Sequence, residues 1–500
     1  MEIEKDEIFN EENCEFIVLH PEDEKEDINF WYFEKDKIKI DNLFFLDLLN
    51  KTGFRKYSVD QDYFFVYVNN KIVEEVNIST IKDFIKVLMK NPSRNYEEGV
   101  DGLMILRKIT EVAPSVLTKG NLEFLDKLED DFKYDTSKKS FIYFENCFVE
   151  VTADGYEIHD YIDLDKHIWR AQIINREFNP EKEESDFKKF IMMVCRFDEN
   201  RYNSLRSAIG YLLHTYKDPV IAKAIIFMDE KLDDNPNGGS GKSLLGSAIA
   251  EVRQSLRLGG KNFRFDRFSF QSYEPGTSII EINDISRNFP FEMLFTIITD
   301  NIVIEKKNKD EIIIPFKYAP KILLSTNYTI KGLDESSLRR QFIIEFSDYF
   351  NMRYTPADEF GSRFFENWSQ FEWDKFYMFM IECLQYYLKN GLVDYERVNL
   401  DKKKLIVSTS EEFVEFVEDI ETNKWYGKKE MYRKFLENYP EYTNRQFRQY
   451  TFTTWFKTYA KLNKLIYEIK KINDDRYFRI ISEDTPPDQS EIQSDQGNLF

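Results

Sequence analysis

The sequence predicts a mixed α/β protein of several domains, centred on a parallel sheet. The chain has 500 residues, 42% of them apolar, which suits about two to four hydrophobic cores better than one. Short apolar strands alternate with helical segments from Ala222 to about Phe346, as in α/β layer structures. Within that stretch a glycine-rich loop at 238–241 separates an apolar strand from a helix.

Composition narrows the classes of function. The net charge of −21 argues against a protein that coats DNA nonspecifically, so any DNA contact must be local. No stretch approaches the roughly 20 consecutive apolar residues that cross a bilayer, and the first residues are acidic, unlike a signal peptide. We therefore expect a cytoplasmic protein without a membrane partner.

Cysteines and histidines are scattered, which predicts neither a disulfide framework nor a zinc site. We expect the thiols to be isolated and buried. The residues concerned are Cys14, Cys147, Cys195, Cys383, His20, His159, His167 and His214.

The segments upstream of the glycine loop carry no recognisable chemistry over residues 1 to about 130. Residues 2–27 contain twelve acids and two lysines, which predicts a mobile acidic arm. Asn69-Asn70 lies between two apolar strands and predicts a β-hairpin, and Ser79-Thr80 predicts the cap of a helix that runs towards Lys90. Apolar residues recur at helical spacing over 183–217, a run ended by Asp218-Pro219.

The glycine loop predicts a phosphate-binding loop. It follows the apolar strand Ala224–Met228 and precedes a helix that begins near Leu244, the order such a loop requires. Backbone N–H groups of the loop and the helix amino terminus favour phosphate, Lys242 would reach the β and γ phosphates, and Ser243 would bind Mg²⁺. The predicted nucleotide contacts are Gly238, Gly239, Ser240, Gly241, Lys242, Ser243 and Leu244. Pro236 stands where the general pattern has glycine.

A catalytic acid is expected at the end of a neighbouring strand, and 278–284 is the strand at a suitable distance. Asp284 is predicted to bind metal or activate water, with the cap of a following helix as the alternative. Asn283 stands beside it where a second acid is more usual, and Glu281 on the same strand face could compensate.

Two further polar positions follow later strands. Asn327 ends the predicted strand 321–327 and fits a sensor of the γ-phosphate, because ligands of open α/β sheets bind at carboxyl ends of strands. Arg339 and Arg340 precede the strand 342–346, and arginine suits contact with a neighbouring subunit's γ-phosphate.

A lysine-bearing turn lies between two strand patterns at 302–304 and 312–314. Lys306, Lys307 and Lys309 at its tip predict contacts with DNA phosphates, and a solvated hairpin turn is the alternative.

The order and spacing of five features resemble those of a superfamily 3 (AAA+) helicase. The features are the loop ending Gly241-Lys242-Ser243, Asn283-Asp284, the lysine hairpin, Ser325-Thr326-Asn327 and Arg339-Arg340. The likeness is to the helicase half of phage, plasmid and poxvirus primase-helicases, and it covers roughly residues 140–480. It implies a P-loop NTPase core behind a helical collar, assembled into a ring, usually a hexamer, on single-stranded DNA. It also implies that an arginine of the pair acts on a neighbouring subunit, and that the hairpin lysines line a central channel. Asn283 is the departure that puts hydrolysis in question.

The carboxyl-terminal region reverses the charge of the chain. Between Lys424 and Lys471 there are twelve basic residues and four acids, hence 12 − 4 = +8. A helix pair containing Arg445 and Arg448 and a closing hairpin over 465–480 predict a winged-helix-like DNA-binding domain, with a structural lid as the alternative.

The last five residues are similar to the short peptide by which bacterial replication proteins dock on the sliding clamp. Gln496, Leu499 and Phe500 would make the contacts, and a chance apolar end on a disordered tail is the alternative.

The whole sequence thus predicts an acidic arm at 1–27, an α+β N-terminal domain of unknown role at 28–135, and a segment ending in a helical collar at 136–218. There follow the ATPase core at 219–350, a helical subdomain and linker at 351–409, the winged-helix-like domain at 410–482 and a disordered acidic tail at 483–500.

The predicted function is an ATP- and Mg²⁺-dependent DNA helicase that translocates on single-stranded or forked DNA in replication of a phage or mobile element. It has no primase centre of its own, so a separate primase or polymerase is an expected partner. The alternatives are an ATP-switched DNA-binding initiator or scaffold with weak hydrolysis and, less favoured, a small-molecule kinase.

Overall fold

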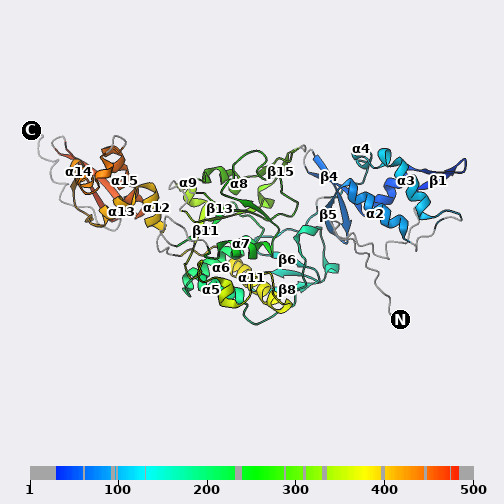
Figure 1. The fold of residues 1–500 in the computed structure, drawn as a ribbon, viewed down its shortest axis with the longest axis horizontal. Helices are drawn as coiled ribbons and strands as arrows, with labels where there is room; N and C mark the ends of the chain where they lie inside the picture. Colours follow the sequence, from blue (N-terminus) through cyan, green and yellow to red (C-terminus); the bar gives the residue numbers. More distant parts are fainter. Residues whose placement is uncertain are drawn as a thin grey trace, which may run out of the picture.

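The chain folds as a mixed α/β protein with a central parallel sheet, as predicted. The computed structural model describes residues 30–59, 62–91, 96, 99–129, 131–230, 239–286, 289–307, 311–328, 335–395, 400–443, 447–472 and 475–482. Figure 1 shows an elongated molecule in which the N-terminal and C-terminal parts lie at opposite ends and the parallel sheet lies between them.

The N-terminal part packs strands and helices around one apolar cluster. Its elements are β1 (Trp31–Glu34), β2 (Lys37–Ile40), α1 (Asn42–Lys51), β3 (Phe54–Val59), β4 (Asp62–Asn69), β5 (Ile72–Val76), α2 (Ile78–Lys90), α3 (Gly102–Val116) and α4 (Lys119–Leu122). The predicted hairpin is confirmed as β4 and β5. Its turn lies one residue later than expected, at Asn70 and Lys71, which have φ of +44° and +68°.

The predicted helix towards Lys90 is confirmed as α2, but its cap is Asn77 rather than Ser79-Thr80. The Asn77 side chain accepts a hydrogen bond from the backbone N–H of Thr80. An amide at this position satisfies one of the free N–H groups of the first turn.

A second sheet precedes the core and ties the N-terminal part to it. Strands β6 (Ser140–Phe144), β7 (Phe148–Val151), β8 (Tyr156–His159) and β10 (Ile173–Ile174) form this sheet in the order β10-β6-β7-β8. The short strand β9 (Ile168–Trp169) instead pairs with β5, so the N-terminal sheet draws one strand from beyond the predicted boundary at residue 135.

The helical stretch predicted over 183–217 is two helices, α5 (Asp186–Val194) and α6 (Glu199–Leu213). Arg196 and Phe197 between them have φ of +53° and +58°, a conformation that no α-helix continues through. Asp198 then caps α6. Helix α6 packs along the aromatic helix α11 (Gln370–Asn390).

The central sheet has five parallel strands in the order β12-β13-β16-β11-β17. The strands are β11 (Ala224–Asp229), β12 (Ser255–Gly259), β13 (Ile279–Ile285), β16 (Lys321–Thr326) and β17 (Gln341–Phe346). The inner strands are buried along nearly all of their length, which explains their continuous apolar runs. Because β11 and β13 both flank β16, their carboxyl ends lie at one edge of the sheet.

The C-terminal part has its own apolar cluster. Its elements are α12 (Leu400–Ser408), α13 (Glu411–Glu418), β18 (Tyr426–Gly427), α14 (Lys428–Asn438), α15 (Gln449–Leu462), β19 (Leu465–Ile472) and β20 (Asp475–Ser482). The predicted closing hairpin is confirmed as β19 and β20, and β18 pairs with β20. Leu405 of α12 is buried in this cluster, so this folded unit begins before residue 410.

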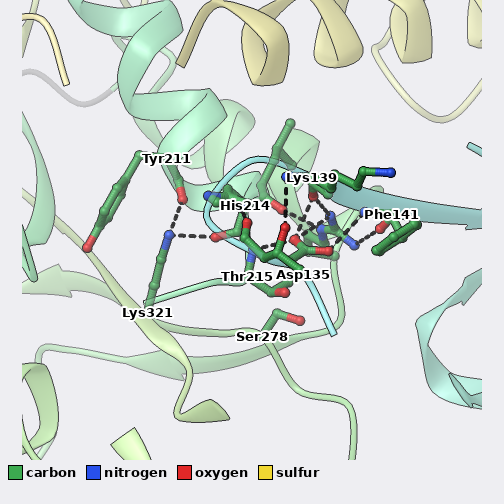
Figure 2. A network of polar contacts seen from close by, with 12 residues as sticks. Asp135, Lys139, Phe141, Tyr211, His214, Thr215, Ser278 and Lys321 are labelled. Atoms are coloured by element: carbon green, nitrogen blue, oxygen red, sulfur yellow. Dashed lines mark hydrogen bonds and ion pairs between the residues drawn. The ribbon is translucent and has the colours of Figure 1, made fainter. Parts of the chain in front are cut away.

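A buried polar network joins the segment before β6 to the ends of α6 and β16. Asp135 accepts hydrogen bonds from the backbone N–H groups of Phe141 (2.9 Å) and Thr215 (2.8 Å), and Arg253 lies 3.7 Å away. The Lys321 ammonium donates to the carbonyl oxygens of Tyr211 (2.7 Å) and His214 (2.5 Å), as Figure 2 shows. Burial lowers the pKa of Lys321 well below its ordinary value.

Asp135→Asn should destabilise the protein strongly. The amide keeps the shape of the carboxylate but removes the buried anion beside Arg253, and such a loss costs about 3 kcal/mol. Chemical denaturation would measure the change in the free energy of unfolding. Asp131→Asn is the matched control, because Asp131 forms an exposed pair with Lys166 (3.0 Å). Equal stability of the two variants would contradict this account.

Candidate functional site

The predicted phosphate-binding loop connects β11 to helix α7 (Lys242–Ala250). Gly238 lies outside the described residues, whereas the loop residues 239–241 are described. Gly239 and Gly241 have φ of +109° and +96°, which side chains other than hydrogen rarely allow. Ser243 is exposed in the first turn of α7 and Leu244 is half-buried beside it.

The collar helix α5 lies directly behind this loop. A Cβ placed on Gly241 would lie 2.6 Å from the Phe190 ring atom Cζ, closer than real atoms approach. Phe190 itself is fully buried. The loop can therefore rest against the collar only because residue 241 is glycine.

Lys242 is buried and points towards the end of β11. Its ammonium lies 2.5 Å from an Asp229 carboxylate oxygen and 3.1 Å from the Ser240 hydroxyl, which itself donates to Asp229 at 2.6 Å. Burial lowers the pKa of Lys242, and the Asp229 carboxylate opposes that shift. Asp229 therefore balances the charge that the loop would offer to phosphate.

Asp284 lies at the same edge of the sheet, in an irregularity of β13. The pairing of β13 with β16 shifts register between Ile282 and Ile285, and Asp284 has a φ of +59°. Bulges of this kind redirect side chains next to active sites. The Asp284 carboxylate accepts a hydrogen bond from the Asn327 amide at 3.3 Å and lies 3.0 Å from the exposed Lys261 ammonium.

Asn283 holds this bulge from the other side. Its side-chain oxygen accepts a hydrogen bond from the Ser325 hydroxyl, and that hydroxyl accepts one from the backbone N–H of Asp284 at 2.9 Å. Asn283 and Ser325 therefore fix the backbone of Asp284 against strand β16. Asn283, which stands where a second acid was expected, thus has Ser325 as a structural partner.

Glu281 does not stand in for that second acid. The residue is 2% exposed, and its carboxylate lies 2.6 Å from Arg257 Nε. A Cβ on Gly246 of α7 would lie 2.3 Å from this carboxylate. Glu281 therefore packs beneath α7, and the expectation that it compensates for Asn283 is wrong.

The two adjacent arginines have different surroundings. Arg340 donates to the carbonyl oxygen (3.0 Å) and the hydroxyl (2.6 Å) of Ser336, and its guanidinium lies 4.5 Å from the centre of the Phe295 ring. Arg339 ends helix α9 (Glu335–Arg339) and is exposed. Arg340 is thus occupied within its own chain, and Arg339 faces solvent.

The lysine-bearing turn is a hairpin of β14 (Ile302–Ile304) and β15 (Ile312–Ile314). Lys307 is exposed and Lys306 half-buried, whereas Lys309 lies outside the described residues. Glu305 at the base of the turn pairs with Arg267 at 2.8 Å.

The C-terminal part presents basic side chains around α15. Arg448 precedes this helix and is exposed, as is Lys457 on it, whereas Arg445 lies outside the described residues. Burial lowers the pKa of Lys428, and the neighbouring charges of Lys457 and Arg476 lower it further. Like charges held this close favour an anionic partner. The clamp-docking residues Gln496, Leu499 and Phe500 also lie outside the described residues, and their role stays a prediction.

Sequence reasoning missed Asp229, Ser325 and Lys261 as members of this site. Asp229 directly follows the apolar run 224–228, so the strand-end rule that selected Asn327 could have selected it as well. Ser325 lies in the motif that contains Asn327, but its role depends on a register that sequence does not show. Lys261 lies in a loop with no local signal.

Metal clusters and membrane helices were sought in the same described ranges. No group of three or more His, Cys, Asp and Glu side chains there could hold a metal ion. None of the helices in these ranges is both long and apolar enough to cross a bilayer. Cys147, Cys195 and Cys383 are free and buried, as expected.

Comparison with solved structures gives distant likenesses. No family model and no curated protein matches the sequence. An apo structure of the NrS-1 C-terminal region aligns with 14% identity and a TM-score of 0.41, covering 87% of this chain and 98% of that one. A second such structure has 15% identity and a TM-score of 0.42, with 89% and 100% covered. JCV helicase aligns with 14% identity and a TM-score of 0.24 over 32% of this chain and 45% of that one. Any function must therefore be inferred from the geometry of the site.

On the prediction that this loop binds ATP, Asp229→Asn should raise the affinity for ATP by about tenfold, or about 1.4 kcal/mol, because the carboxylate competes with phosphate for Lys242. Titration with a fluorescent ATP analogue would measure it. Asp300→Asn is the control, since Asp300 is exposed and far along the chain from the loop. A fall in affinity would instead assign Asp229 to the binding of metal or to the shape of the loop.

Proposed function

We propose that this chain is an ATP-dependent motor that translocates on single-stranded DNA, a helicase of DNA replication. The observation that supports this most is the gathering of Lys242, Asp284 and Asn327 at one edge of a parallel sheet. Loop lysine, strand-end acid and strand-end amide are the groups that an ATPase requires around the γ-phosphate.

The residues present suit ATP with Mg²⁺. Backbone N–H groups of 239–243 and the Lys242 ammonium would hold the phosphates, with Lys242 leaving Asp229 as phosphate arrives. The exposed Ser243 hydroxyl and the Asp284 carboxylate are oxygen ligands of the kind that Mg²⁺ prefers, and the ion would neutralise phosphate charge there. Asp284 would orient the attacking water and Asn327 would contact the γ-phosphate.

The arginine pair supports an oligomer. Arg340 is bound to Ser336 of its own chain, so Arg339 is the better candidate for the arginine that reaches a neighbour's γ-phosphate. Its exposure at the end of α9 suits a contact between subunits. In a closed ring such as a hexamer, every subunit would have such a neighbour.

Contacts with DNA are assigned to two basic surfaces. Lys306 and Lys307 on the hairpin would bind phosphates, and Lys309 keeps the same predicted role. From α13 onwards the C-terminal part has the element order helix, strand, helix, helix and hairpin, and its clustered cations around α15 suit a duplex or forked DNA.

An ATP-switched initiator with weak hydrolysis is the second candidate. The bond between Asn283 and Ser325 favours it, because Asp284 is then the single acid that the end of β13 supplies. Under this reading the motif binds nucleotide and signals to DNA-binding surfaces without rapid turnover.

Lys242→Ala should abolish hydrolysis and unwinding in a protein whose wild type shows ATPase activity stimulated by single-stranded DNA. Loss of the charge that holds the phosphates typically removes activity by a factor of about 10³. Phosphate release and strand displacement on a forked duplex measure both activities. Lys389→Ala, at an exposed position of α11, is the control.

The outcomes of that assay separate the candidates. Unwinding by Lys242→Ala would refute the motor. Nucleotide-dependent DNA binding by the wild type with little turnover would favour the initiator. Phosphoryl transfer to a small molecule without DNA dependence would indicate a kinase.

Arg339→Ala should lower ATP turnover by about 10³-fold while leaving nucleotide affinity intact, because the arginine acts in the transition state on a neighbour's phosphate. Mixing Arg339→Ala with Lys242→Ala subunits should restore part of the turnover, since some interfaces then combine an intact loop with an intact arginine. Arg340→Ala should instead lower thermal stability. Full turnover by Arg339→Ala would contradict the assignment.

A further inference from the structure

A groove of about 1310 Å³ lies between the N-terminal part and the core. One wall comes from strands β3, β4 and β5, and the other from residues 273–278 and 312–319. Residues 132–137 run along its floor, including Asp135 of the buried polar network in Figure 2. None of the predicted nucleotide-binding residues lines it.

Aromatic rings line this groove from both walls. Tyr134 and Tyr318 are stacked with ring centres 3.9 Å apart and planes inclined by 20°. Tyr134 precedes the core in the sequence, whereas Tyr318 belongs to the core. Tyr57 meets Trp169 edge-on at 5.5 Å. The partly exposed rings are Tyr57, Tyr63, Phe64, Tyr134, Tyr216 and Tyr318. Flat, partly exposed rings suit partners that have flat faces themselves.

Lysines accompany these rings. Five lysines line the groove, namely Lys119, Lys133, Lys166, Lys306 and Lys317, against the acids Glu75, Asp135 and Asp165. Asp165 pairs with Lys133 at 2.6 Å, Lys166 pairs with Asp131 at 3.0 Å, and Asp135 is bound within the buried network. The ammonium groups of Lys119 and Lys317 lie 4.6 Å and 4.4 Å from the ring centres of Tyr63 and Tyr318. In a chain of net charge −21 this is a local concentration of cations.

We propose that this groove binds a single strand of DNA, with bases stacked on its tyrosines and phosphates held by Lys119, Lys317 and their neighbours. Stacking on aromatic rings requires unpaired bases, which excludes an intact duplex, and a positively charged groove can follow the phosphates of a single strand. An apolar peptide would offer no anionic group to Lys119 and Lys317. The proposal rests on the proposed function for the choice of DNA and gives the N-terminal part a role in it.

The groove is continuous with the lysine hairpin. Lys306 and the strand β15 line the groove, and Lys307 follows at the exposed turn. DNA bound at Lys306 would therefore already lie at the groove.

Photo-crosslinking of the full-length wild type tests the groove directly. An oligo-deoxythymidylate carrying 5-iodouracil is irradiated with the protein in the absence of nucleotide, and the linked peptides are identified by mass spectrometry. Links at Tyr63, Tyr134 or Tyr318 are expected. Links confined to the C-terminal part or to the hairpin would overturn the proposal.

Charge reversal supplies an independent measure. Lys119→Glu with Lys317→Glu should weaken binding of the oligonucleotide at least about tenfold and reduce the slope of log K against log salt by about 1.4, since each phosphate contact contributes about 0.7. Lys82→Glu with Lys86→Glu, both exposed on α2 away from the groove, changes the charge equally and should leave both values unchanged. Equal effects of the two pairs would overturn the proposal. Circular dichroism shows whether these variants fold. The crosslinks of the wild type do not depend on the folding of the variants.

Failure of this proposal is distinguishable from failure of the motor. ATP hydrolysis stimulated by DNA in a wild type that shows no links in the groove would refute the groove alone. Links in the groove without stimulated hydrolysis would refute the motor alone. Lys242→Ala should retain the links, because this contact needs no ATP.

Discussion

The parallel register of three strands is the constraint on which the site depends. Met228 of β11 and Ile285 of β13 both lie opposite Thr326 of β16, so the three strands end at one level. The phosphate-binding loop leaves one strand there, and Asn327 follows another. Asp284 reaches the same edge only because β13 bulges before Ile285. In an unbroken strand the side chains would continue to alternate between the two faces of the sheet at this position.

Close approach of helices to this sheet is the second constraint. Gly246 lets α7 lie against the Glu281 carboxylate, and Gly241 lets the loop lie against Phe190 of the collar. Larger residues at either position would lift the loop from its support. Glu281 is therefore part of the packing under α7, paired with Arg257, and helix α5 supports the loop directly.

Local patterns in the sequence predicted the features that depend on local physics. The strand, loop and helix around Lys242, and the β4–β5 hairpin with its asparagine turn, follow from neighbouring residues. Features set by distant pairing were not predictable. The break at Arg196 and Phe197 interrupts a continuous apolar period, β9 joins the sheet of another part, and Glu281 finds Arg257 on the adjacent strand.

The groove and the proposed nucleotide site lie at opposite ends of the same strands. Thr277 and Ser278 line the groove directly before β13, and Ala319 lines it just before β16. The other ends of these strands carry Asp284 and Asn327, roughly 20 Å away at the usual rise per residue. Lys321, the first residue of β16, is bound to carbonyl oxygens of α6, which fixes the groove end of that strand. DNA in the groove and a phosphate at Asn327 would thus contact opposite ends of one rigid sheet. A shift of that sheet would move both contacts.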